Sequence, residues 1–386
     1  MLRGRDLVIT GAAVMGPTGS FDDGISVVVR DGVVAAVGRD IPRGLEVVDL
    51  AGHWLMPGVH DCHSHVFWNQ FHAADRERLP LTYRTAAAAR SLEATLRAGV
   101  TSVRDAGGAD AGLRDAVRDG LLVGPRLAIS IEIIDGDSVT GADDMRRRVR
   151  EVVAAGATWV KLAATRGVMG PEGTELEATL DADELRAAVA EASAGGARVM
   201  VHAWGGPAVT DAIAAGVASI EHAIFLTEEQ AQAAVAADVT IVPTLEVYRE
   251  VHALALAGAL PDFVVERTER VARAHPESVR MARAAGVRIA LGSDFASPDQ
   301  HGRNLEEIAA LAEAGLGIEG ALVAATRAGA GLLAETGVRG AIEPGAVFDA
   351  VVLGREPSHP EVFRDRSAVT GVYLAGIPVA AGDVTH

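Results

Sequence analysis

Hydrophobic and polar positions change their pattern twice along the chain. In residues 1–57 short apolar runs alternate with Gly/Asp turns, which is typical of small antiparallel sheets. These runs are Asp6 to Ile9, Ile25 to Val29, Val33 to Val37 and Leu45 to Leu50. Residues 339–386 show the same pattern, with strand-like runs at Val347 to Leu353 and Val369 to Leu374. We therefore expect residues 1–57 and 339–386 to meet in one small β-sandwich domain.

Between these ends, in residues 58–338, apolar runs alternate with segments rich in Ala, Glu and Arg. Strands are expected at Met56 to Val66, Thr101 to Arg104, Arg126 to Ile134, Trp159 to Ala163, Val199 to Ala203, Ser219 to Ile224, Thr240 to Leu245 and Arg288 to Asp294. Two of the intervening helices begin with capping-box pairs, Asp181 with Glu184 and Thr227 with Gln230. This alternation predicts an α/β fold, a (β/α)8 barrel whose active site lies at the C-terminal ends of the strands.

Composition and charge limit the class of protein. A chain of 386 residues with 49% hydrophobic content can bury a large core, and its one cysteine, Cys62, cannot form an internal disulfide and fits a reducing compartment. The net charge of −17 disfavours nucleic acid and anionic membranes as partners. The stretch from Met1 to Arg5 is not followed by an apolar leader segment. We expect a cytoplasmic protein with a small-molecule substrate, and leave assembly into a homo-oligomer open.

Polar side chains stand at the C-terminal ends of the predicted barrel strands. They are His63 and His65 at the end of the first strand, Lys161 on the fourth, His202 on the fifth, His222 on the sixth and Asp294 on the eighth. The period of two in a strand puts His63 and His65 on the same face. Neutral imidazole and carboxylate are common ligands of borderline divalent metals. A single His-x-His pair is weak evidence, whereas the ordered set strongly indicates a metal site.

Lys161 is the only lysine among the 35 Lys and Arg residues of the chain, and it stands in an apolar run. Unlike a guanidinium, a desolvated lysine amine can lose its proton and act as a nucleophile. Its reaction with CO2 gives a carbamate, an anion with two oxygens that can bridge two metal ions. The alternative is a core lysine paired with a carboxylate.

With these residues in place, the chain resembles the amidohydrolase superfamily over nearly its whole length. The resemblance is carried by four segments, Met56 to His65, Ala98 to Asp105, Ile220-Glu221-His222 and Leu291-Gly292-Ser293-Asp294. Within the superfamily the chain looks most like the branch of imidazolonepropionase-related amidases and prolidase-like peptidases. The stretches Val242-Pro243-Thr244 and Ala324-Ala325-Thr326 are similar to stretches common in that branch.

The resemblance implies a binuclear centre with two divalent ions, of which zinc is favoured and manganese and cobalt are alternatives. His63, His65 and Asp294 would hold the more buried ion, His202 and His222 the more exposed ion, and carbamylated Lys161 with a hydroxide would bridge them. Two such ions lower the pKa of a bridging water and polarise the scissile carbonyl. Asp294 would carry the proton to the leaving amine.

The loops depart from those of the relatives. The Gly-Gly-His stretch after the third strand is absent from Asp135 to Thr140, and Trp204 stands where the relatives carry a tyrosine two residues after the fifth-strand histidine. The Thr-Gly-Gly after the lysine strand reads Thr165-Arg166-Gly167. The candidate substrate-binding residues are Arg166, Trp204, Tyr248 and His301. Three of them have a plainer interpretation: Arg166 as an arginine on a solvated loop, Tyr248 as a packed aromatic and His301 as an exposed histidine.

These observations favour a metal-dependent hydrolase that cleaves an amide bond in a peptide-like molecule, an N-acyl amino acid or a cyclic amide. Hydrolysis of an ester, lactone or organophosphate on the same site is the main alternative. Mononuclear deamination fits less well because it has no use for Lys161. A non-catalytic assembly protein that kept the barrel and lost its metals is disfavoured by the intact ligand set.

Overall fold

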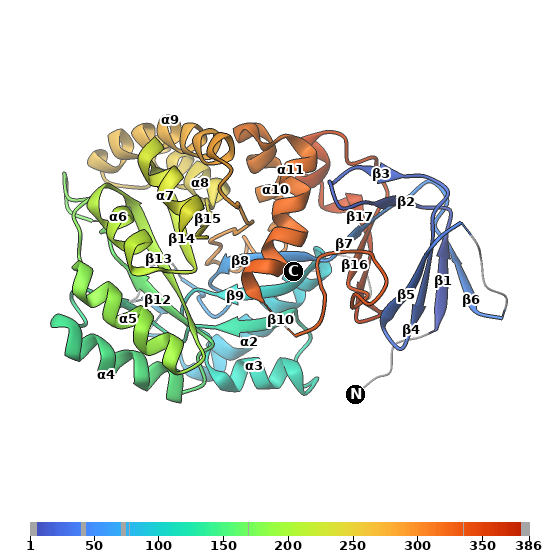
Figure 1. Ribbon diagram of the computed structural model, residues 1–386, viewed down its shortest axis with the longest axis horizontal. Helices are drawn as coiled ribbons and strands as arrows, with labels where there is room; N and C mark the ends of the chain where they lie inside the picture. Colours follow the sequence, from blue (N-terminus) through green and yellow to red (C-terminus); the bar gives the residue numbers. More distant parts are fainter. Residues whose placement is uncertain are drawn as a thin grey trace.

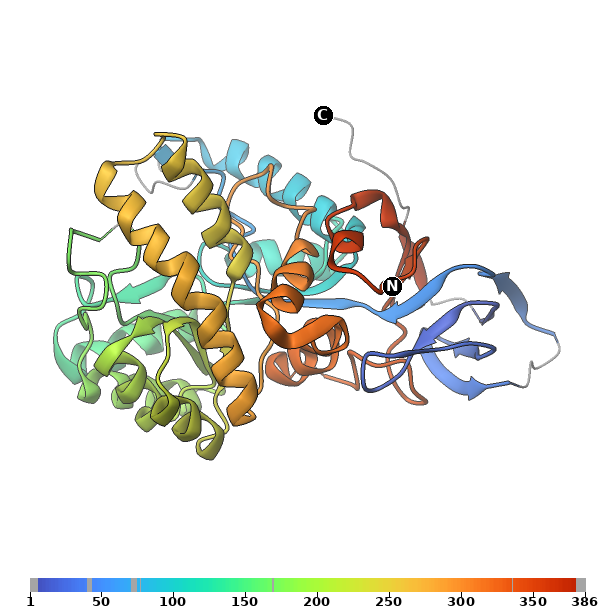
Figure 2. The ribbon, with the colours of Figure 1, turned by 90° about the horizontal axis from the view of Figure 1, so that it is seen from above.

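The computed structural model describes residues 6–39, 44–70, 75–76, 78–168, 170–334 and 336–379. Figure 1 shows a β-rich lobe, built from blue and red strands, beside a larger lobe in which strands are covered by helices. Figure 2 shows the long helix α9 (Asp262–Ala285) running across the larger lobe. The larger lobe carries the strands whose ends bear the candidate site.

The β-rich lobe consists of two packed sheets. One has the order β5-β4-β1-β6, with β1 (Leu7–Thr10), β4 (Ser26–Arg30), β5 (Val33–Gly38) and β6 (Glu46–Asp49). The other has the order β18-β17-β16-β7-β2-β3, with β2 (Ala13–Met15), β3 (Phe21–Asp22), β7 (Trp54–Pro57), β16 (Ala350–Leu353), β17 (Val369–Leu374) and β18 (Ile377–Val379). Ile9 and Val27 from the first sheet share one buried cluster with Leu55 and Val352 from the second.

The two ends of the chain meet in the second sheet, where β7 pairs antiparallel with β16. The expectation of purely antiparallel sheets is wrong, because β1 pairs parallel with β6 and β2 pairs parallel with β7. Both of these pairs are joined by long connections that bring the chain back in the same direction. The division of the chain at residues 57 and 338 stays a prediction.

The larger lobe contains two parallel sheets, with the orders β10-β9-β8 and β11-β12-β13-β14-β15. The strands are β8 (Val59–Ser64), β9 (Val100–Asp105), β10 (Arg126–Ile129), β11 (Ile133–Asp135), β12 (Trp159–Ala163), β13 (Arg198–Gly205), β14 (Ser219–Phe225) and β15 (Thr240–Val242). This arrangement confirms the α/β class.

The helices of the larger lobe follow these strands. They are α2 (Leu81–Arg97), α3 (Ala111–Arg118), α4 (Gly141–Ala154), α5 (Ala182–Ala194), α6 (Gly206–Ala215), α7 (Glu228–Ala236), α8 (Leu245–Leu256), α9, α10 (Glu306–Leu311), α11 (Gly317–Val323) and α12 (Gly329–Leu333). Two π-helical turns, Ala312–Leu316 and Ala324–Ala328, join the last three, and short 3-10 helices cover Pro360–Phe363 and Arg366–Ala368. The capping boxes predicted for α5 and α7 are both confirmed.

Two predicted strands of the larger lobe are each divided in the structure, and the predicted strand from Thr240 to Leu245 ends at Val242. The run from Met56 to Val66 is divided at Gly58, because β7 pairs with β16 in the β-rich lobe whereas β8 pairs with β9 in the larger lobe. The run from Arg126 to Ile134 is divided by Ile131, whose φ of 70° is left-handed and breaks the ladder.

The eighth predicted strand, Arg288 to Asp294, is wrong as a regular strand. It holds only an isolated bridge between Ile289 and Ile241. Its backbone is nevertheless hydrogen-bonded on both sides, from Ala290 N to Ile241 O at 3.0 Å and from Cys62 N to Leu291 O at 2.8 Å. The left-handed φ of 55° at Asp294 ends the extended backbone at that residue. The segment therefore links β15 to β8.

The helical run Glu306–Leu333 is long and apolar enough by length and composition to cross a membrane. In its most apolar stretch of 18 residues, 56% of the residues are buried inside the protein. Ile308, Leu311 and Leu322 belong to the main core cluster, and Gly315 interrupts the run with a φ of 116°. Core packing is sufficient to explain its apolar side chains.

A buried carboxylate joins the two lobes. Asp349, 3% exposed, accepts hydrogen bonds from Arg126 at 2.7 and 3.0 Å, from Arg339 at 2.9 Å and from the backbone N–H of Ala375 at 2.7 Å. Removing one partner of a buried ion pair leaves the other charge without compensation.

We predict that Asp349→Ala lowers the free energy of unfolding by about 3 kcal/mol, because it leaves Arg126 and Arg339 without their carboxylate. Urea denaturation measures the change. The matched control is Glu343→Ala, which breaks the half-exposed pair with Arg327 and is expected to cost less than about 1 kcal/mol. Equal losses in the two variants would contradict the proposed connection.

Candidate metal centre

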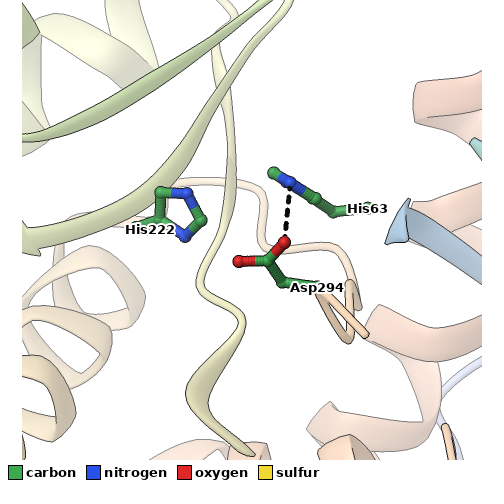
Figure 3. A group of neighbouring side chains, drawn as sticks. All are labelled: His63, His222 and Asp294. Atoms are coloured by element: carbon green, nitrogen blue, oxygen red, sulfur yellow. Dashed lines mark ion pairs between the residues drawn. The ribbon is translucent and has the colours of Figure 1, made fainter. Parts of the chain in front are cut away.

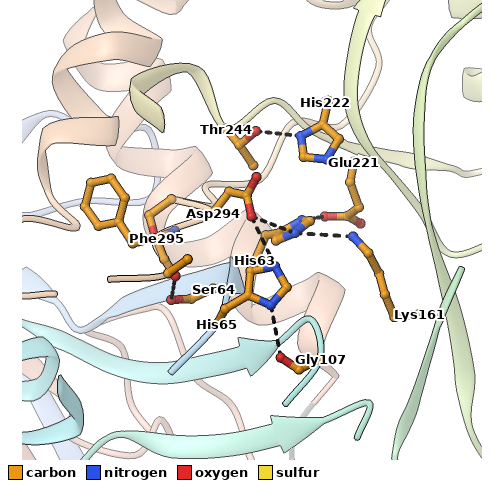
Figure 4. A network of polar contacts seen from close by, with 12 residues as sticks. His63, Ser64, His65, Gly107, Lys161, Glu221, His222, Thr244, Asp294 and Phe295 are labelled. Atoms are coloured by element: carbon orange, nitrogen blue, oxygen red, sulfur yellow. Dashed lines mark hydrogen bonds and ion pairs between the residues drawn. The ribbon is translucent and has the colours of Figure 1, made fainter. Parts of the chain in front are cut away.

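The side chains predicted at the strand ends converge on one site. His63, His222 and Asp294 each offer a ligand atom, and these atoms lie within 4.8 Å of one another (Figure 3). Asp294 Oδ1 is 3.3 Å from His63 Nε2 and 3.2 Å from His65 Nε2. Lys161 Nζ is 3.3 Å from His63 Nε2 (Figure 4), and the rings of His202 and His222 are 4.5 Å apart. The structure thus brings all the predicted metal-binding side chains together.

Hydrogen bonds on the outer nitrogens orient three of the imidazoles. His63 Nδ1 is 2.6 Å from Glu221 Oε2, His65 Nδ1 is 3.0 Å from Gly107 O, and His222 Nδ1 is 2.7 Å from Thr244 Oγ1. The carboxylate and carbonyl can only accept, so Nδ1 of His63 and of His65 carries a proton. Each ring then turns Nε2 toward Asp294, which is the arrangement of histidines that bind metals.

A buried chain of charged groups stands behind His63. Arg104 on β9 donates to Glu221 Oε1 at 2.9 Å and to Ser219 Oγ at 2.9 Å, while Ser219 donates to the same carboxylate oxygen at 2.5 Å. Arg104, Ser219 and Glu221 are fully buried. Sequence reasoning missed this chain as a structural element. The available signal was an arginine and a glutamate inside apolar strands, where unpaired charges are too costly to bury.

Two further buried carboxylates hold the loops around the site. Asp105 accepts from the backbone N–H groups of Val66, Gly107 and Ala109 at 2.9 to 3.0 Å, and so fixes the loop that presents Gly107 O to His65. Asp61 accepts from Ser293 Oγ at 2.6 Å, just before Asp294. Burial raises the pKa of both carboxyl groups, and these hydrogen bonds offset it in part. Neither residue was among the predicted site residues.

Contacts beyond hydrogen bonds also restrain the histidines. The ring of Trp68 stacks on His65 with centroids 3.8 Å apart and planes at 16°. Gly167, with a φ of 73°, passes so close to His202 that a Cβ would lie 3.0 Å from Nε2. The loop carrying Gly167 is held by buried Arg267 of α9, which donates to Val168 O at 2.6 Å and Gly170 O at 2.7 Å. His202 therefore packs against a loop whose position is fixed by Arg267.

Left-handed backbone geometry is concentrated at the site. His222, Thr244 and Asp294 have φ values of 74°, 60° and 55°, and such conformations cost about 1–3 kcal/mol each for residues with a Cβ. The bond between His222 and Thr244 and the bond from Asp294 N to His63 O at 2.7 Å hold these residues in place. These backbone conformations direct the side chains of the three residues toward the same site.

The electrostatic environment disfavours the charged form of His202 and His222 and favours the charged form of Asp294. Burial lowers the pKa of His202 to about 3 and that of His222 well below its ordinary value. Burial and Lys161 lower the pKa of His63, but Asp294 and Glu221 outweigh them and raise it. Burial alone would raise the pKa of Asp294, yet His63 and His65 hold it well below its usual range.

The pKa of Glu221 is shifted against the effect of its burial, whereas the pKa of Lys161 is shifted in the direction that burial favours. Desolvation would raise the pKa of Glu221, but Arg104 and His63 lower it to about 2. Desolvation lowers the pKa of Lys161 to about 8, although Glu221 and Asp294 act in the other direction. Part of the Lys161 amine is therefore uncharged near neutral pH.

The candidate substrate-binding residues fall into two groups. Trp204 and Tyr248 adjoin the cluster, since their side chains are hydrogen-bonded at 2.9 Å and the Tyr248 ring lies 5.5 Å from that of His222. Arg166 is engaged by Asp137 at 2.7 Å on the surface. The interpretation of His301 as an exposed histidine is wrong, because its side chain is buried at 3% exposure. Its Nδ1 lies 3.4 Å from Thr95 Oγ1 of α2.

The donor atoms fit divalent metal ions. His63 Nε2 and Asp294 Oδ1 are both electron-pair donors when Nδ1 carries the imidazole proton, so their 3.3 Å contact requires a cation or a second proton. Two ligands at 2.0–2.1 Å from a tetrahedral ion lie about 3.3 Å apart, which matches the contacts of Asp294 with His63 and His65. Nitrogen and carboxylate oxygen suit zinc and related ions.

Comparisons with known proteins agree with this site. A family model described as the Amidohydrolase family matches residues 54–379. Ochratoxinase from Aspergillus niger is 27% identical over 398 residues, covering 91% of this chain and 82% of that protein. Imidazolonepropionase from Salinispora tropica is 28% identical over 417 residues, covering 97% and 94%. The resemblance inferred from the sequence is confirmed.

Solved structures give the same result. A prolidase complexed with N-methylphosphonate-L-proline has a TM-score of 0.89 and 30% identity, over 97% of this chain and 100% of that chain. The Aspergillus niger ochratoxinase structure has a TM-score of 0.89 over 100% of this chain and 98% of that chain, and at 24% identity it supports the fold alone.

The Glu221 shift predicts a pH-dependent effect of Glu221→Gln in the metal-free protein. A folded pKa of about 2 lies below the unfolded value of about 4.3, so between these values protons bind the unfolded chain more and stability falls as the pH falls. The free energy of unfolding of the wild type should exceed that of the variant by about 3 kcal/mol at pH 7, and by less at pH 3.5. Urea denaturation at the two pH values measures the gap, and an unchanged gap would mean that Glu221 is not ionised.

Proposed function

The chain belongs to the amidohydrolase family, and we propose that it uses two divalent metal ions to hydrolyse an amide bond of a small molecule. The protein is thus a hydrolase acting on amide bonds, and the proposal concerns its metals, substrate and catalytic residues. The observation that carries it is the contact of one Asp294 oxygen with Nε2 of both His63 and His65.

The proposed scaffold is a distorted (β/α)8 barrel. The two parallel sheets are joined by the segment from Arg288 to Asp294, which is hydrogen-bonded to β15 and to β8. The sheets adjoin at their other edges as well, where the chain runs from β10 into β11 and Thr158 N, just before β12, donates to Ile129 O at the end of β10 at 3.0 Å. In a closed barrel all the strand ends face one mouth, which accounts for the convergence of side chains from distant parts of the sequence.

His63, His65 and Asp294 are proposed to bind one ion, and His202 and His222 the other. Among these ligands His63, His65 and His222 are buried, whereas His202 and Asp294 are partly exposed. When bound, two such ions would activate a water molecule and polarise the carbonyl group of the substrate. Zinc is the proposed metal, with manganese and cobalt as alternatives.

Lys161 is proposed to join the two sites as a carbamate. Its uncharged amine would attack CO2, a new N–C bond would form, and the nitrogen would release a proton to solvent. The product is an anion with two oxygens on a buried side chain. Without this modification the Lys161 amine lies against His63 Nε2, which is itself a candidate metal-binding atom. Glu221 and Arg104 stay paired behind it and hold His63.

Asp294 is proposed to move the proton. Oδ1 faces His63 and His65, which leaves Oδ2 to receive a proton from the attacking water and pass it to the nitrogen of the leaving amine. Amide hydrolysis needs this transfer because an unprotonated amide nitrogen is a poor leaving group. The proposed substrates are peptide-like molecules, N-acyl amino acids and cyclic amides.

The proposal predicts that the protein loaded with zinc, manganese or cobalt cleaves members of a library of dipeptides, N-acyl amino acids and cyclic amides. Release of the amine measures cleavage, and chromogenic esters, lactones and phosphotriesters form the comparison set. Cleavage of these alone would favour the alternative hydrolase. Metal-loaded protein that cleaves neither set would contradict the function.

Lys161→Arg should lose one of the two metal ions and at least 100-fold in kcat, because arginine keeps a positive charge and does not form a carbamate. Metal analysis by mass spectrometry and amine release measure the two effects. Arg150→Lys, at an exposed position of α4 paired with Glu191, is the control for Lys/Arg exchange. Two bound ions and full activity in Lys161→Arg would refute the bridging role.

A further inference from the structure

Trp204 and Tyr248 form a buried pair beside the metal-binding cluster. Trp204 lies at the end of β13, two residues after His202, and Tyr248 lies in the first turn of α8. The indole Nε1–H donates to the phenol oxygen at 2.9 Å. Trp204 is fully buried and Tyr248 is 8% exposed, so the pair is held rigidly within the wall of the site.

The direction of this hydrogen bond is fixed by chemistry. An indole nitrogen can only donate, and a phenol oxygen can both accept and donate. The bond therefore uses a lone pair of the Tyr248 oxygen and leaves its proton available. Among the described residues, no acceptor receives that proton. A phenol also keeps its proton at neutral pH because its ordinary pKa is about 10.

The available proton belongs to a group that borders the cluster. The Tyr248 ring stands edge-on to His222 at 83°, with centroids 5.5 Å apart, and Asp294 is close enough to act on the hydroxyl electrostatically. One point, the position that a Gly167 Cβ would take, lies 3.0 Å from His202 Nε2 and 3.9 Å from Trp204 Nε1. The indole nitrogen of Trp204 therefore lies on the side of the pair near His202, and the Tyr248 ring lies beside His222.

The surroundings of the pair are apolar. Trp204 and Tyr248 share a buried cluster with Ile224, Val247 and Val271. In a poorly solvated environment a single neutral hydrogen bond stabilises a developing negative charge more than it would in water. A fixed donor beside two candidate metal ligands is placed to act where such a charge develops.

We propose that Tyr248 donates a hydrogen bond to the carbonyl oxygen of the scissile amide, and that Trp204 is the positioning residue that aims the hydroxyl. The inference rests on the proposed function and extends it by assigning the group that stabilises the developing oxyanion. No proton is transferred from Tyr248; the hydroxyl stays a donor as charge grows on the oxygen. Trp204 acts only through Tyr248.

The test compares Tyr248→Phe, Trp204→Phe and the double variant. Removal of one oxyanion donor costs about 10²–10³ in kcat, so Tyr248→Phe should lower kcat about 100-fold while KM changes little. Trp204→Phe should lower kcat less, about 10-fold, because the donor remains but is no longer aimed. In the Tyr248→Phe background, Trp204→Phe should add no further loss.

Tyr373→Phe is the matched control, because Tyr373 lies on β17 in the β-rich lobe and the substitution again removes one phenol oxygen. It should leave kcat unchanged. Metal stoichiometry and the thermal unfolding midpoint are measured for every variant, so that loss of metal or of folding is separated from loss of the donor.

Binding of methylphosphonate to the metal-loaded protein supplies a readout that does not need turnover. Its tetrahedral anion resembles the developing oxyanion, so calorimetry should show about 10-fold weaker binding to Tyr248→Phe than to wild type. If wild type cleaves no amide but shows this difference, the proposed function fails, whereas Tyr248 is still a hydrogen-bond donor to a tetrahedral anion at the metal centre. If Tyr248→Phe keeps both wild-type affinity and wild-type kcat, the donor assignment is overturned.

Discussion

The orientation of the candidate centre depends on a fully buried carboxylate, Glu221, held between a cation and an imidazole. Arg104 supplies the cation that keeps Glu221 ionised despite its burial, and Glu221 in turn holds the proton of His63 on Nδ1. Without this chain, either nitrogen of His63 could carry the proton, and the ring would have no reason to present Nε2 to Asp294. A charge buried in this way costs free energy unless it is paired, and the pairing here orients a donor atom for a metal ion.

The same logic extends outward from His63. Each neighbouring histidine is fixed by a different contact: His65 by Gly107 O and by the face of Trp68, His222 by Thr244, and His202 by the close approach of Gly167. The backbone strain at His222, Thr244 and Asp294 is compensated by these contacts. The site is therefore organised before any ligand binds, as expected for a centre that must hold metal ions in a fixed geometry.

Much of this arrangement could be predicted from the sequence, because strand periodicity is local. The spacing of two between His63 and His65, and the position of Lys161, His202 and His222 at the ends of apolar runs, are enough to place these side chains at one edge of a parallel sheet. The caps of α5 and α7 are equally local, since Asp181 and Thr227 bond residues three positions away.

The remaining features depend on contacts between distant segments. Nothing near Arg104 in the sequence indicates Glu221, 117 positions away, and nothing near Trp204 indicates Tyr248. The breaks at Ile131 and Asp294 arise from left-handed backbone that apolar patterning does not reveal. Loop residues such as Arg166, which pairs with Asp137, are also beyond local rules, because their partners come from other loops.

The central claim is that these residues hold two metal ions joined by a modified Lys161. The most direct measurement is a crystal structure of the zinc-loaded protein with anomalous diffraction data at the zinc edge. The account predicts two anomalous peaks about 3.5–4 Å apart between the histidines and Asp294, with density for a carboxyl group on Lys161 Nζ. A single peak, or a bare amine turned away from the metal, would contradict it.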